Sequence, residues 1–101
     1  MAHKMAAATA ETLTTTRVLT AAEVKQYAFW AIDPGGAGRA ITLPDAADVV
    51  GEMIWVTNTA DAAEVLTISD DTGTVVTPTQ AESAVLWCDG TRWRGIAGSN
   101  A

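Results

Sequence analysis

The chain has 101 residues and a mass of 10.5 kDa, the size of one small domain, so a large multi-domain enzyme is excluded. Its 12 acidic and 6 basic residues give a net charge of −6, which disfavours binding to the phosphate backbone of a nucleic acid. One cysteine and one histidine cannot form an intramolecular disulfide or a structural zinc site, so we expect neither a metal nor a cofactor.

Not all of the apolar side chains are large enough to build a core, because 20 of the 49 apolar residues are alanine and only 29 are larger. Fifteen threonines, nine valines and four tryptophans favour strands, since β-branched and aromatic side chains fit a pleated surface. No run reaches the roughly 18 to 20 apolar residues that cross a bilayer, and the alanine-rich start is unlike a signal peptide. We therefore expect a soluble β-rich protein that is made in the cytoplasm and binds no membrane.

The first 16 residues hold few large apolar side chains, with Met5 and Leu13 the exceptions after the initiator. Such a segment cannot bury enough surface to order itself, so residues 1–16 are predicted to be a flexible N-terminal arm. The arm is either a frayed tail or a segment that becomes ordered on a partner. Residues 17–101 are predicted to form a single β domain.

A helix signal opens this domain. Thr20 and Glu23 have the spacing of a capping box, which predicts one helical turn over residues 21–24. A helix continuing to residue 31 competes with a strand over residues 26–32, and the aromatic side chains of that segment favour the strand.

The strand over residues 26–32 is followed by a Pro- and Gly-rich turn at 33–38. A second short strand is predicted over 39–43, where alternate apolar side chains share one face. Residues 26–43 are therefore predicted to form a hairpin with a loose loop.

The middle of the chain alternates short strands with turns. Pro44 and Gly51 bracket a single predicted helical turn. The segment 52–57 is apolar on both sides of its alternation, which predicts a strand that is covered on both faces. Further strands are predicted over 64–69 and 74–77, each bounded by turn residues.

The C-terminal segment carries the clearest hairpin signal, because residues 83–88 and 92–97 flank Asp89-Gly90. About seven short strands emerge, at the spacing of a sandwich or barrel. The predicted fold is therefore all-β: a small β-sandwich or barrel of about seven short antiparallel strands, with one or two single-turn helices and an extended N-terminal arm.

Catalytic groups are hard to place in this fold. His3 lies in the predicted arm, where no rigid scaffold fixes it against a nucleophile. Asp70 and Asp71 before Gly73 lack the ligand alternation of a calcium loop, so they are interpreted as a solvated turn. The glycine-rich segment 35–38 lacks the Lys-Ser/Thr of a phosphate loop. We expect no enzymatic activity.

Charge is unevenly distributed, since nine acids and no base lie between Arg39 and Arg92. This pattern fits either a solvated acidic surface or a division in which the basic remainder of the chain meets an acidic partner.

Tryptophan placement gives the candidate interface. Three tryptophans lie in apolar strands and are predicted core residues: Trp30, Trp55 and Trp87. The fourth, Trp93, lies between two arginines after the Asp-Gly turn and is equally an interface anchor or a core residue. The candidate interface residues are Arg17, Trp55, Arg92, Trp93 and Arg94.

The order of several short motifs resembles small β modules of tailed bacteriophage particles. The motifs are Leu19-Thr20-Ala21-Ala22-Glu23, Ile41-Thr42-Leu43-Pro44, the strand between Gly51 and Asn58-Thr59, and Asp89-Gly90-Thr91-x-Trp93. The resemblance covers residues 17–97. Those modules include capsid decoration (cement) proteins and the β domains of head or tail fibres.

The resemblance implies a structural virion protein that binds the outer surface of a phage head as a homotrimer and stabilises the shell. Its partners would be the major capsid protein and its own copies, and no catalytic residues carry over. The alternative is a head-fibre, tail-fibre or spike module that recognises the host surface. A small enzyme or inhibitor comes third, because the sequence shows no rigidly placed histidine.

Overall fold

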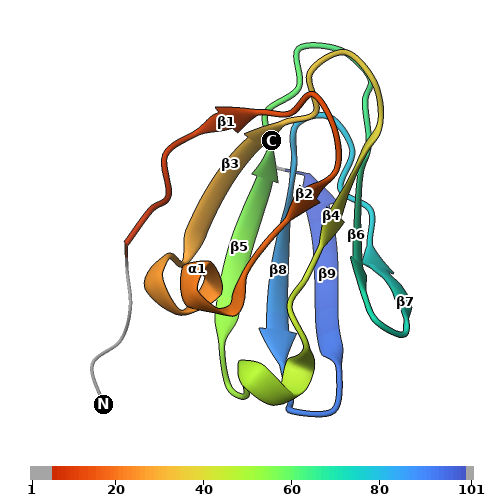
Figure 1. Cartoon of the computed structure of the whole chain (residues 1–101). Helices are drawn as coiled ribbons and strands as arrows, with labels where there is room; N and C mark the ends of the chain where they lie inside the picture. Colours follow the sequence, from red (N-terminus) through yellow and green to blue (C-terminus); the bar gives the residue numbers. More distant parts are fainter. Residues whose placement is uncertain (1–5, 100–101) are drawn as a thin grey trace.

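The computed structural model describes residues 6–99, which form two mixed β-sheets with little helix (Figure 1). Sheet A has the strand order β1-β3-β5-β8-β9, and sheet B has the order β2-β4-β6-β7. The strands of sheet A are β1 (Glu11–Thr12), β3 (Phe29–Asp33), β5 (Met53–Asn58), β8 (Glu82–Cys88) and β9 (Trp93–Ser99). The strands of sheet B are β2 (Arg17–Val18), β4 (Arg39–Thr42), β6 (Leu66–Asp70) and β7 (Gly73–Val76).

The first six strands alternate between the two sheets. In sheet A, β3 pairs in parallel with β1 and β5, and in sheet B, β4 pairs in parallel with β2 and β6. The chain therefore makes three turns of a β-helical winding, each turn giving one strand to each sheet. It then reverses, because β7, β8 and β9 pair antiparallel with β6, β5 and β8.

This winding overturns two predictions. Residues 26–43 do not form a hairpin, because β3 and β4 lie in different sheets. An all-antiparallel arrangement is wrong as well, since four of the seven described strand pairings are parallel, and neither sheet closes into a barrel. The predicted hairpin around Asp89-Gly90 is confirmed as β8–β9.

The hydrophobic core lies between the sheets. In β3, β5, β6 and β8, alternate residues point inward and are buried, while their neighbours face outward, as the two-residue period of a strand requires. The buried core residues of the strands are Trp30, Ile32, Ile54, Val56, Ala84, Leu86, Cys88 and Trp93 in sheet A, and Ile41, Leu66 and Ile68 in sheet B.

Half of the predicted arm lies against the domain. The backbone N–H of Ala8 donates to the Phe29 carbonyl at 2.9 Å, and that of Leu13 donates to the Asp33 carbonyl at 2.8 Å. The Leu13 side chain is buried in the core, and Gly35 is required beside it because any Cβ there would collide with the Leu13 carbonyl. Residues 6–13 therefore extend sheet A, while the start of the predicted arm, residues 1–5, lies outside the described residues.

Two short helices occupy the predicted positions. Helix α1 (Ala21–Gln26) begins at a capping box in which Thr20 and Glu23 cap each other, and it buries Val24. The 3-10 helix η1 (Ala46–Asp48) lies between Pro44 and Gly51. No helix within residues 6–99 is long and apolar enough to cross a membrane.

Candidate functional site: the outer face of sheet A

The outward side of sheet A carries an unusual number of large apolar residues. We define the outer face as the outward positions of its four long strands. These are Phe29, Ala31 and Asp33 of β3, Met53, Trp55 and Thr57 of β5, Ser83, Val85 and Trp87 of β8, and Arg94, Ile96 and Gly98 of β9. None of these twelve positions is fully buried.

Strand register aligns the apolar side chains into a row across the whole sheet. Phe29 pairs with Trp55, Trp55 with Val85, and Val85 with Ile96. An isolated bridge adds Ala7 beside Phe29 at the other edge. We call these five residues the apolar row. Because each member is the direct cross-strand neighbour of the next, all five lie at one level along the strands.

Part of this row is open to solvent in the single chain. The side chain of Ile96 is 62% exposed, and Met53 beside the row is 39% exposed. The Phe29 and Trp55 rings stack with their centroids 5.2 Å apart. A shallow groove of about 370 Å³ runs along Trp55, Val85 and Ile96, so the rest of the chain leaves this part of the row open. The prediction that strand 52–57 is covered on both faces therefore does not hold within one chain.

The apolar row has polar neighbours on one side and mainly apolar neighbours on the other. On one side the Thr57 and Ser83 hydroxyls share a hydrogen bond of 2.9 Å. On the other side Met53 pairs with Trp87, and Trp87 pairs with Arg94. The only charged residues of the outer face are Asp33 and Arg94, at opposite ends and on different strands. The face is consequently close to neutral on a chain with a net charge of −6.

Of the predicted interface residues, Trp55 lies at the centre of the outer face, whereas Trp93 lies in the core. The Trp93 side chain is 0% exposed, and its indole Nε1–H donates to the Pro44 carbonyl at 3.0 Å. Its backbone N–H donates to Asp70 Oδ2 at 3.1 Å. A fully buried side chain cannot anchor a partner, so Trp93 is a core residue. Trp30 is buried as predicted, but Trp55 and Trp87 are only half-buried.

Arg17, another predicted interface residue, is used within the chain. Its guanidinium donates to Glu11 at 2.8 Å and to Glu23 at 2.9 Å, and it lies over the Trp30 ring at 5.6 Å. These bonds raise the pKa of Arg17, and the hydrogen bond from Arg17 lowers the pKa of Glu23 to about 2. Arg17 therefore connects β1, β2 and α1 and is not a free cation for a partner.

Arg92 and Arg94 lie at one corner of the outer face. Arg94 Nε donates to Asp89 Oδ2 at 3.1 Å, and Arg92 Nε lies 3.6 Å from Asp70 Oδ2. Together with Trp87 they border a hollow of about 410 Å³. The structure thus brings three of the five predicted residues to the outer face and its corner, namely Trp55, Arg92 and Arg94.

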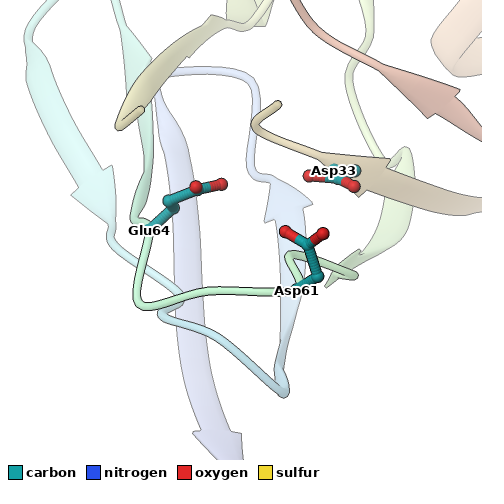
Figure 2. A group of neighbouring side chains, drawn as sticks. All are labelled: Asp33, Asp61 and Glu64. Carbon is teal, nitrogen blue, oxygen red and sulfur yellow. The ribbon is translucent and has the colours of Figure 1, made fainter. Parts of the chain in front are cut away.

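Three carboxylates that sequence reasoning missed converge at the far end of β3 (Figure 2). Asp33 ends β3, while Asp61 and Glu64 lie in the loop between β5 and β6, and ligand oxygens of all three lie within 4.8 Å of one another. Backbone N–H groups of the glycine-rich turn bind two of them, with Gly35 donating to Asp33 at 2.9 Å and Gly36 to Glu64 at 3.1 Å.

Oxygen ligands of this kind suit Ca²⁺ or Mg²⁺, but exposed acidic groups commonly cluster without an ion. The cluster therefore receives no functional assignment. No local motif indicates this carboxylate cluster, because its members come from separate turns.

The loop between β5 and β6 is held by a buried amide. The Asn58 side chain donates to the Glu64 carbonyl at 2.9 Å and to the Pro78 carbonyl at 3.1 Å.

Comparisons with known proteins find no relative of this chain. No protein-family model matches the chain, and neither a search of curated proteins nor a search of solved structures finds a match. A proposal about function therefore depends on the outer face itself.

Proposed function

We propose that this chain is a structural virion protein that decorates the outer surface of a tailed-phage head. In this proposal it is a small β-sandwich that acts as a homotrimer, binds the major capsid protein and stabilises the shell. The observation that carries the proposal is the partly exposed apolar row on the outer face of sheet A, which fits a protein that works as an assembly of copies. A binding role fits this surface better than a catalytic one, because the face offers apolar area and few polar groups.

Physical considerations support an assembly role. Monomeric proteins rarely expose a contiguous apolar patch of large side chains, and such patches usually mark a contact with another protein. A domain of this size also has a small core, and its only cysteine, Cys88, is buried and free. Burial of the outer face against neighbours adds stability that the isolated chain lacks.

The sequence resemblance supports the choice of partner. Its Asp89-Gly90 element forms the β8–β9 hairpin, which contributes half of the strands of the outer face. Its Gly51 element leads into β5, which carries Trp55. Two of the four motifs of the resemblance therefore lie in strands of the outer face, whereas the Leu19–Glu23 motif leads into α1 and the Ile41–Pro44 motif ends β4 of sheet B.

Thermal release of DNA tests the stabilising role. Heads of the phage that encodes this chain, prepared without it, are heated in the presence of a DNA-binding dye, with or without the purified protein. We expect the midpoint of DNA release to rise by several degrees with the protein and to stay unchanged with an unrelated small acidic protein. An unchanged midpoint at saturating protein would contradict the proposed function.

A further inference from the structure

We infer that the outer face of sheet A is the contact between copies of this chain, with three copies arranged around an axis parallel to the strands. In this arrangement the β9 edge of one copy adjoins the Ala7 and Phe29 edge of the next. The inference rests on the proposed trimer and specifies which surface forms it. It leaves the shell to be bound by other surfaces of the assembled trimer.

Register is the first argument. The apolar row crosses sheet A at one level, from Ala7 at one edge to Ile96 at the other. Rotation about an axis parallel to the strands preserves that level. The Ile96 end of one row therefore meets the Ala7 end of the next, and three rows close into one apolar ring. A contact of this kind joins unlike surfaces and forms a closed ring when the rotation closes.

Charge is the second argument. Copies that each carry −6 repel one another wherever acidic surfaces meet. The apolar row itself carries no charged residue; the single acid of the outer face, Asp33, clusters with Asp61 and Glu64 at one end of the face, and its single base, Arg94, lies at the other end. The row is consequently the part of the face on which copies of this acidic chain meet without strong repulsion.

Area is the third argument. Four strands of five to seven residues, about 4.8 Å apart and with about 3.3 Å per residue, cover roughly 400 Å² in projection. The accessible surface of a face covered by side chains is larger than its projection. Stable interfaces take roughly 800 Å² of accessible surface from each partner. The complete face, rather than one groove, therefore has about the size that association of copies needs.

The mass of the protein in solution tests the inference. Analytical ultracentrifugation of the full chain should give the mass of three chains. Ile96→Lys places a charge in the ring and should weaken association by at least about tenfold while the melting temperature of the monomer is kept. The matched control is Val50→Lys, because Val50 is 63% exposed and lies outside the outer face. A monomeric wild type, or an Ile96→Lys protein with the same trimer affinity as Val50→Lys, would overturn the inference.

Disulfide trapping tests the ring geometry. In the Ala7→Cys/Ile96→Cys variant the two new thiols of one chain lie about 19 Å apart, across four strand spacings, which is too far for an internal bond. Between copies they adjoin, so oxidation should give a covalent trimer on a non-reducing gel. Covalent species that stop at two chains, or no cross-linked species, would contradict the three-fold ring. The native Cys88 is buried, and its exchange for alanine controls for its involvement.

The experiments distinguish failure of the proposed function from failure of the proposed contact between copies. A wild-type trimer that has no effect on DNA release from heads would keep this inference and reject the proposed function. Protection of heads by an Ile96→Lys protein that remains trimeric would keep the function and reject this contact.

Discussion

The buried carboxylate of Asp70 organises the corner where the two sheets meet. Its side chain is 1% exposed and accepts hydrogen bonds from the Thr72 hydroxyl at 2.7 Å and from the Trp93 backbone N–H at 3.1 Å. Burial raises the pKa of Asp70, but the hydrogen bonds from Thr72 and Trp93 and the charge of Arg92 lower it more, so the pKa lies below its ordinary value. The folded state therefore favours the ionised form.

We expect this carboxylate to make stability depend on pH. A lowered folded-state pKa contributes stability that is complete above the unfolded value near 3.8 and is lost as pH falls through the folded value. Asp70→Asn cannot titrate and should lose about 2 kcal/mol of unfolding free energy at pH 7. Urea titrations of both proteins should show this difference shrinking as the pH falls below the unfolded value near 3.8. A free-energy difference that stays constant as the pH falls would contradict the role given to the Asp70 carboxylate. Glu23 and Asp89 titrate in both proteins, so their contributions cancel when the two proteins are compared.

Trp93→Ala should destabilise folding and leave the contact surface between copies intact. Removal of a fully buried tryptophan costs about 3–5 kcal/mol and leaves the Pro44 carbonyl without its donor. Chemical denaturation at low protein concentration measures this loss. The control is Trp87→Ala, which removes a half-buried tryptophan from the outer face and should cost less unfolding free energy. Equal losses in the two variants would contradict the placement of Trp93 in the core.

Residue types alone could not predict that the Trp93 side chain points into the core. Trp93 follows a turn, and the direction of the first side chain of a strand depends on where the ladder begins. The Asp-Gly turn predicted the hairpin but not that Trp93 would be inward and Arg94 outward. Similarly, the apolar alternation of 52–57 correctly predicted a strand, while the cover on its outer side is not encoded in that segment.

Among the elements, the segment before β2 departs most from expectation. Its low apolar content predicted a flexible arm, yet one buried side chain, Leu13, and backbone pairing with β3 are enough to place residues 6–13 on the sheet. Residues 6–13 pair in parallel with β3, which supplies the backbone hydrogen bonds that the segment cannot make within itself. Local composition misses this, because the partner strand lies about 20 residues further along the chain.

We expect Leu13→Ala to lower the unfolding free energy by about 2–3 kcal/mol, because it leaves a cavity in the core. Thr15→Ala, at an exposed position nearby, should change it by less than about 0.5 kcal/mol. Urea denaturation measures both. Equal and small effects would show that the segment is an arm after all. For the same reason, a role of the N-terminus in shell binding is tested by deletion of residues 1–5 and not of residues 1–16.

Strand positions were predictable from the sequence, but pairing was not. The expected segments at 39–43 and 83–88 coincide closely with β4 and β8, since turn residues and alternation are local signals. Pairing partners are non-local. Short connections normally join antiparallel neighbours, whereas here they carry the chain from one sheet to the other, and the parallel partner comes one full turn later. The acidic cluster of Asp33, Asp61 and Glu64 was hidden for the same reason.

At the scale of the whole molecule, the pairing of strands in sheet A places the apolar row on its outer face, with the carboxylates of Asp33, Asp61 and Glu64 at one end of that face. Each of the strands β3, β5, β8 and β9 contributes one member of the row, so no single segment reveals it. Covering this row would remove apolar surface from water, and the row carries no charge that would oppose contact between copies of an acidic chain. In the proposed trimer, the remaining surfaces would face the shell.

Quantitative sedimentation with phage heads tests the central claim most directly. Heads prepared without this protein are saturated with it, pelleted, and analysed for the number of copies bound per head. The proposed function predicts a saturable number that is a multiple of three and matches the three-fold or quasi-three-fold positions of the shell. Absence of the protein from the pellet would contradict the account, and a few copies at one vertex would indicate a fibre or spike module instead.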